Sequence, residues 1–197
     1  MLTYNYQSCP LNKISFLEGM KAALVASKDF EDGYYTSPPQ HGLRAFGLVG
    51  SAWLFGQTWY LNHGYLGNGR YRSLKDFMRG EAENSFLGTC DANDILTLLR
   101  TWQLGDISRI RIVSPSLQGD LAGVLGSITA KGLVMPSKED LFFPPKVSEL
   151  EVAAMKNNGS KLVVIASDWG HIAGGPLNND DIDFVNDQVR QFFGNDL

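Results

Sequence analysis

The hydrophobic pattern of the sequence changes near residue 115, and this change limits what the chain can fold into. Before it, apolar residues recur every three or four positions, as on a helix that packs one face against a core. The pattern predicts helices over residues 15–27, 73–87 and 91–103. Ser73 is placed to cap the second of them and Asp91 or Asn93 the third, because such side chains accept hydrogen bonds from first-turn amides.

After residue 115 the pattern becomes strand, helix, strand, helix. Short apolar runs predict strands at 132–137 and 161–167, and the second run has no alternation, which is typical of a strand covered on both faces. Amphipathic segments predict helices at 148–157 and 180–193. Ser148 and Glu151 fit a capping box at the start of the first. A strand, a helix and a second strand predict a βαβ unit with parallel strands.

Two parallel strands do not make a stable sheet by themselves. The strand at 132–137 is therefore expected to have another neighbour on its far side. Residues 2–7 could supply this neighbour, and further strands of an N-terminal half would supply it better. The sequence thus predicts a helical region over 1–115 and a βαβα region over 116–197, which together form one incomplete α/β domain.

Composition excludes several classes of protein. Of the 197 residues, 44% are hydrophobic and 19% charged, as in globular proteins, and the net charge of −4 gives no support for nucleic-acid binding. The apolar stretch 42–56 contains Arg44 and several glycines, which favours a buried helix over a membrane span. Cys9 and Cys90 fit neither a disulfide framework nor a metal site, and no signal peptide is recognised, so a cytoplasmic setting is expected.

Two titratable residues follow the ends of the two predicted strands. Asp140 follows the first and His171 follows the second. Ligands of parallel α/β sheets bind beyond the carboxyl ends of the strands, and neighbouring strands lie about 5 Å apart. The two loops should therefore emerge side by side. An acid beside a histidine can fix its tautomer and stabilise the imidazolium, while the histidine acts as general base and then general acid.

A plainer interpretation exists for each residue alone. An aspartate after a strand is often only a turn former, and a histidine in a glycine-rich loop is more often a surface residue. Their order on consecutive strands favours catalysis, since α/β-hydrolases place serine, acid and histidine in that order. The serine has no counterpart here: no serine of the 197 residues has glycine two positions before and two positions after it.

Several segments resemble the homoserine O-acetyltransferase branch of the α/β-hydrolase superfamily. SCPLNKISFLEGMKAAL and DANDILTLLRTWQLGDIS resemble segments of that family's helical lid. LVMPSKEDLFFPP resembles its acid loop, and DWGHIAGG resembles its histidine loop. The resemblance implies that 1–115 is the lid or cap and 116–197 the last two parallel strands with their helices. It also implies that Asp140 and His171 are the catalytic acid and base of a Ser-Asp-His triad.

The resemblance further implies acyl transfer from a small-molecule donor to an alcohol or to water. An acyl-CoA could serve as co-substrate, and no other cofactor and no metal is expected.

The sequence departs from the family in two places. The family's nucleophile elbow precedes the lid, and this chain begins about where the lid begins, so the nucleophile half is expected to be missing. Ile172 stands where homoserine-type enzymes carry an aspartate that holds the substrate's amino group.

Two functions remain open from the sequence. The chain could be part of an acyltransferase or an esterase-type hydrolase, or it could be a catalytically inactive fragment that acts as a binding or interaction protein. An exposed strand edge would then favour a homo-oligomer.

Trp169, close to His171, is expected to shape the site. Arg44 and Arg100 could each bind a substrate carboxylate, although a salt bridge within the lid is the default expectation.

Overall fold

The computed structural model describes residues 11–156 and 159–194, which fold into two compact units. The helical unit comprises the described residues of Cys9–Leu54 and Thr58–Gly105. The strand unit comprises Phe55–Gln57 and the described residues from Asp106 on. The chain therefore leaves the helical unit for a short excursion into the strand unit, returns, and crosses again at residue 106. The assignment of 1–115 to a lid and 116–197 to a hydrolase core stays a prediction.

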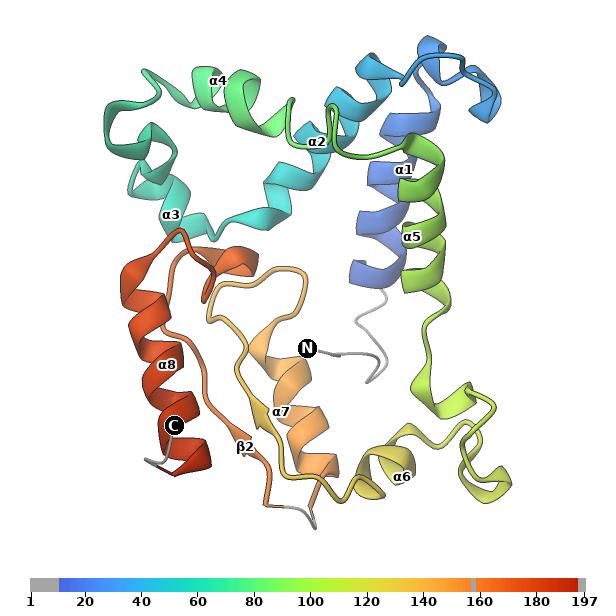
Figure 1. Cartoon of the computed structure of the whole chain (residues 1–197), viewed down its shortest axis with the longest axis vertical. Coiled ribbons are helices and arrows are strands. Elements are labelled where there is room, and N and C mark those ends of the chain that lie inside the picture. Colours follow the sequence, from blue (N-terminus) through green and yellow to red (C-terminus); the bar gives the residue numbers. More distant parts are fainter. Residues whose placement is uncertain (1–10, 157–158, 195–197) are drawn as a thin grey trace. The chain divides into compact units, whose positions relative to one another are not determined.

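The helical unit is built around α1, which packs against both α2 and α5 (Figure 1). Leu17, Leu24 and Leu43 are fully buried in its core. The elements are η1 (Leu11–Phe16), α1 (Leu17–Val25), η2 (Lys28–Gly33), α2 (Gln40–Leu54), α3 (Gln57–Leu61), η3 (Gly64–Gly69), α4 (Leu74–Phe77), η4 (Met78–Ala82) and α5 (Ala92–Leu104). Among the described residues, no helix is both long enough and apolar enough to cross a bilayer.

The helix caps expected from the sequence are confirmed in this unit. The Asp91 side chain accepts hydrogen bonds from the amides of Asn93 and Asp94, and Ser73 accepts one from the amide of Asp76. The helix expected at 73–87 is shorter than predicted: α4 runs into the π-helical turn η4, which contains Gly80, a residue that weakens helices.

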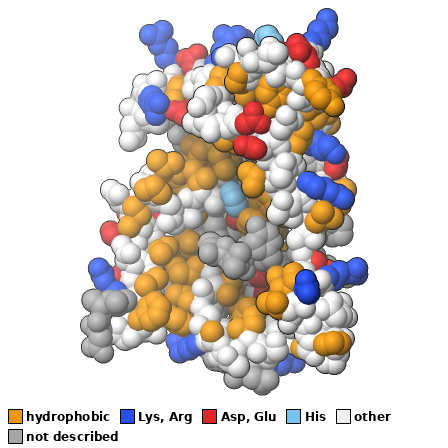
Figure 2. All heavy atoms as spheres, turned by 45° about the vertical axis from the view of Figure 1, so that its right-hand side comes forward, with side chains coloured by type: hydrophobic (Ala, Val, Ile, Leu, Met, Phe, Trp, Pro, Cys, Tyr) orange, Lys and Arg blue, Asp and Glu red, His pale blue; other side chains and the backbone are white. Residues whose placement is uncertain are grey.

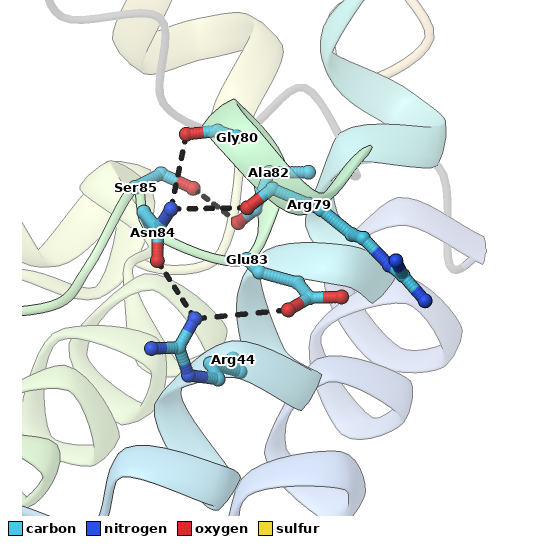
Figure 3. A network of polar contacts seen from close by, with 7 residues as sticks. All are labelled: Arg44, Arg79, Gly80, Ala82, Glu83, Asn84 and Ser85. Carbon is cyan, nitrogen blue, oxygen red and sulfur yellow. Dashed lines mark hydrogen bonds and ion pairs between the residues drawn. The ribbon is translucent and has the colours of Figure 1, made fainter. Parts of the chain in front are cut away.

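Arg44 of α2 forms an ion pair inside the helical unit, in agreement with the default expectation. Its Nη1 lies 3.6 Å from Oε2 of Glu83 and donates a 2.7 Å hydrogen bond to Oδ1 of Asn84 (Figure 3). The Asn84 amide nitrogen in turn donates to the carbonyls of Arg79 and Gly80. The network ties α2 to the turn after η4, and it engages the Arg44 guanidinium that could otherwise have bound a substrate carboxylate.

The strand unit contains the βαβ arrangement that the sequence predicts. Its strands β1 (Leu133–Val134) and β2 (Lys161–Leu162) pair in parallel and are joined through α7 (Pro145–Ala154). Figure 1 shows α7 and α8 (Asn179–Phe193) on opposite sides of the strand pair. The other elements are η5 (Ile107–Arg109), η6 (Pro115–Leu117), α6 (Leu121–Gly126) and η7 (Gly170–Ile172).

The strand pairing extends beyond the short assigned strands. Leu133 is opposite Lys161, and the same register continues to an isolated bridge between Ser137 and Ile165. The Ile165 amide donates to the carbonyl of Pro136, and the Lys138 amide donates to the carbonyl of Ile165. The two predicted strand regions are thus held together up to the point where the acid loop begins.

Three sequence expectations for this region need correction or stay open. The helix expected at 148–157 begins instead at Pro145 with Pro144 as its N-cap, so Ser148 does not cap it. Proline suits the first helical position because its missing N–H would be unpaired there anyway. The strand expected to be covered on both faces leaves Val164 37% exposed. Residues 2–7, the suggested extra strand, lie outside the described residues.

Candidate active site

Asp140 and His171, separated by α7 and β2 in the chain, meet in the strand unit. Nδ1 of His171 lies 3.0 Å from Oδ2 of Asp140. The expectation that the two loops emerge side by side is therefore confirmed. The Asp140 side chain is only 8% exposed, whereas that of His171 is 33% exposed. The acid is thus shielded while the histidine can still be reached from outside.

The second oxygen of Asp140 is fixed by its own loop. Oδ1 accepts hydrogen bonds from the backbone amides of Phe142 and Phe143, at 2.8 and 2.9 Å. An aspartate that accepts hydrogen bonds from the amides two and three residues later forms a local turn motif that the sequence itself favours. Because these bonds occupy Oδ1, they turn Oδ2 toward the histidine. The carboxylate is therefore oriented before any substrate arrives.

Two aromatic rings lie against the imidazole. The ring of Phe142 is centred 4.9 Å from that of His171, and the ring of Phe143 is centred 5.3 Å from it. Phe142 is buried and Phe143 half-buried. Phe142 and Phe143 thus donate their amides to Asp140 and place their rings against His171. Their rings therefore restrict how the imidazole can turn.

A short segment from earlier in the chain packs against both loops. A β-carbon on Gly56 would lie 2.4 Å from the carbonyl oxygen of Asp168 and 2.8 Å from the β-carbon of Glu139. Only glycine fits at this spacing without moving one loop or the other. The ring of the neighbouring Phe55 is centred 6.3 Å from the ring of Trp169, so this segment also contacts the residue two positions before His171. Sequence reasoning did not find this role of Gly56, because nothing near residue 56 indicates the distant contact.

The histidine loop has a further support that sequence reasoning missed. Asp181, buried in the first turn of α8, accepts hydrogen bonds from the hydroxyl of Ser167 and from the amide of Gly174. Within the described residues, no group of three or more histidine, cysteine or acidic side chains could hold a metal ion.

Comparison with solved structures identifies the architecture. An acetylester hydrolase from Corynebacterium glutamicum matches 96% of this chain with a TM-score of 0.83 and 27% identity. A homoserine O-acetyltransferase from Bacillus anthracis matches 95% of it with a TM-score of 0.75 and 21% identity, which shows a shared fold. This chain covers 52% and 50% of those two structures. Its fold is that of the C-terminal portion of an α/β-hydrolase.

Curated relatives specify the class further, although no family model matches the chain. A probable esterase from Corynebacterium glutamicum is 28% identical over 183 residues, or 90% of this chain and 49% of the relative. An ethyl acetate hydrolase from Pseudomonas veronii is 32% identical over 134 residues, or 65% of this chain and 35% of the relative. The chain is thus related to esterases of the α/β-hydrolase superfamily, and it spans about half the length of the first of these relatives and about a third of the second.

Proposed function

We propose that Asp140 and His171 are the acid and base of an esterase-type acyl-transfer site. The observation that carries the proposal is the 3.0 Å contact between Nδ1 of His171 and an aspartate whose other oxygen is already engaged by two amides. A carboxylate can only accept hydrogen bonds, so the imidazole donates from Nδ1 and keeps the lone pair on Nε2. Among the described residues, Nε2 has no hydrogen-bond partner.

The proposed reaction uses that lone pair. A serine outside these 197 residues attacks the acyl carbonyl, and Nε2 takes its proton. The imidazolium forms beside Asp140, whose negative charge stabilises it. When the carbon–oxygen bond of the ester breaks, His171 returns the proton to the departing alcohol. Water then repeats the sequence on the acyl-serine, with His171 again acting first as base and then as acid.

The proposed substrate is a short acyl ester, with acetyl esters first, and the acceptor is water. The names of the esterase and ethyl acetate hydrolase relatives support this choice. So does Ile172 beside the base, since an isoleucine cannot pair with the ammonium group of homoserine. Transfer from an acyl-CoA to a different alcohol is the related activity that the same pair of residues could serve.

A fusion protein tests the proposal. This chain is joined behind the preceding half of the Corynebacterium relative, and hydrolysis of 4-nitrophenyl acetate is measured. We expect the fusion to be active and His171→Ala to lower kcat by about 10²–10⁴-fold, the usual contribution of a general base. Circular dichroism and a cooperative melt check that both proteins are folded. A folded, active fusion that keeps its rate after His171→Ala would overturn the proposal.

A second candidate function is that of a non-catalytic interaction protein. It is favoured by the absence of a G-x-S-x-G motif from the sequence and by apolar side chains left at the surface (Figure 2). In the strand unit these include Ile112, Val164, Leu177 and Phe193. A second copy of the chain pairing along the strand edge would be the partner. Sedimentation that gave only a monomer at high concentration would exclude this candidate, and so would His171-dependent esterase activity of the 197-residue chain alone.

A further inference from the structure

The loop that carries His171 is attached at both ends to one carboxylate oxygen. Oδ2 of Asp181 accepts a 2.8 Å hydrogen bond from Oγ of Ser167 and a 3.2 Å hydrogen bond from the amide of Gly174. Ser167 precedes His171 by four positions and Gly174 follows it by three. A single side chain from α8 therefore fixes the points where the loop begins and ends.

The segment between these two points is itself tightly bonded. The Ser167 hydroxyl accepts a hydrogen bond from the amide of Trp169, and the Ala173 amide donates to the carbonyl of Gly170. His171 lies in the short turn η7 between them. With its ends fixed and its middle coiled, the loop has little freedom to rotate the imidazole away from Asp140.

Asp181 differs from the neighbouring acidic residues in its burial and in its hydrogen bonds. Its side chain is buried, whereas Asp180 in the same helical turn is exposed. Within the described residues Asp181 forms no ion pair, so its charge is held by the two hydrogen bonds and by the N-terminus of α8. A helix needs no buried acid at this position, because Asn178 already caps α8.

We propose that Asp181 is a positioning residue for His171. By holding Ser167 and Gly174, its carboxylate keeps the imidazole oriented with Nδ1 toward Asp140 and Nε2 available for proton transfer. The inference rests on the proposed function, because it assigns Asp181 to the same acid–base pair. Asp181 touches neither substrate nor reacting atoms and acts only through the loop.

The test is the tautomer of His171 in the full chain, read from long-range proton–nitrogen correlation spectra at a pH where the ring is neutral. In the unmodified chain we expect the proton on Nδ1. In Asp181→Ala the ratio of the two tautomers should shift by about tenfold toward Nε2–H, because the imidazole turns away and the hydrogen bond between Nδ1–H of His171 and Asp140 is lost. Asp181→Asn should restore the original ratio, because its amide oxygen can accept the same two bonds. The matched control Asp180→Ala should leave the ratio unchanged.

The outcomes separate this inference from the proposed function. If the unmodified chain lacks the Nδ1–H tautomer, the proposed acid–base pair fails. If that tautomer is present and persists in folded Asp181→Ala, only the role of Asp181 is overturned. Should Asp181→Ala not fold, Ser167→Ala replaces it: this variant removes one of the two tethers, and an unchanged tautomer ratio would equally refute the inference.

Discussion

Asp91 in the helical unit and Asp140 in the strand unit make the same local bonds in different surroundings. In each, Oδ1 accepts hydrogen bonds from the amides two and three residues later, and Oδ2 receives a group from far along the chain. For Asp91 that group is the hydroxyl of Tyr35, and for Asp140 it is the imidazole of His171. Asp91 is exposed and Asp140 is buried. Local sequence thus orients both carboxylates, and only burial and the distant partner give one of them a proposed chemical role.

The largest expected effect comes from neutralising each acid in turn in the fusion esterase. Asp140→Asn should lower kcat by about 10²–10⁴-fold, because an amide can neither hold the correct tautomer reliably nor stabilise the imidazolium. Asp91→Asn keeps the cap and should leave kcat within about twofold of the parent. Rates with 4-nitrophenyl acetate decide the matter. Equal losses in the two variants would mean that the pair at Asp140 has no special role.

Stability should separate the two acids as well. Asp140→Ala leaves the buried amide of Phe142 and the half-buried amide of Phe143 without an acceptor, which costs roughly 2–6 kcal/mol at about 1–3 kcal/mol for each unpaired group. Asp91→Ala removes an exposed helix cap and should cost only about 1 kcal/mol. Urea unfolding followed by circular dichroism measures both free energies. A smaller loss for Asp140→Ala than for Asp91→Ala would contradict the burial argument.

The close packing of Gly56 gives an intermediate effect. Gly56→Ala places a methyl group against the backbone of Asp168 and the side chain of Glu139, and such overpacking costs about 1–3 kcal/mol. Gly126→Ala is the matched control in the same unit, because the nearest atom to its new methyl group would be the carbonyl oxygen of Ala154, at an almost ordinary 3.4 Å. Unfolding free energies in urea compare the two. Equal values would show that the two loops give way easily at Gly56.

The smallest effect concerns the pH dependence of the Asp91 cap. The hydrogen bond from Tyr35 lowers the pKa of Asp91 below its ordinary value of 3.8, so the cap's contribution is complete above that value and is lost as the pH falls through the lower, folded-state pKa. Tyr35→Phe should raise the pKa of Asp91, and the contribution should then be lost at a higher pH. Carboxyl-carbon NMR titration measures the change, and an unaltered pKa would refute this assignment.

The contact between Asp140 and His171 could be predicted from the sequence because it depends on rules that act along the chain. Asp140 and His171 each follow an apolar strand, and parallel strands bring such ends together. The start of the helix at Pro145 could also have been predicted, since proline is common at the first helical position. The contacts of Asp181 could not be predicted from the sequence. Asp180, Asp181 and Asp183 look alike there, and only tertiary packing buries one of them.

The three residues Phe55–Gln57 also bear on how such a chain can change over evolutionary time. They belong to the strand unit, although the residues on both sides belong to the helical unit. The helical region therefore cannot be replaced by that of a relative as one continuous segment. Replacing all of residues 9–105 would also remove Gly56, which fits between Glu139 and Asp168. This tripeptide and its position directly after α2 are therefore expected to be inherited together with the loops of Glu139 and Asp168, between which Gly56 fits.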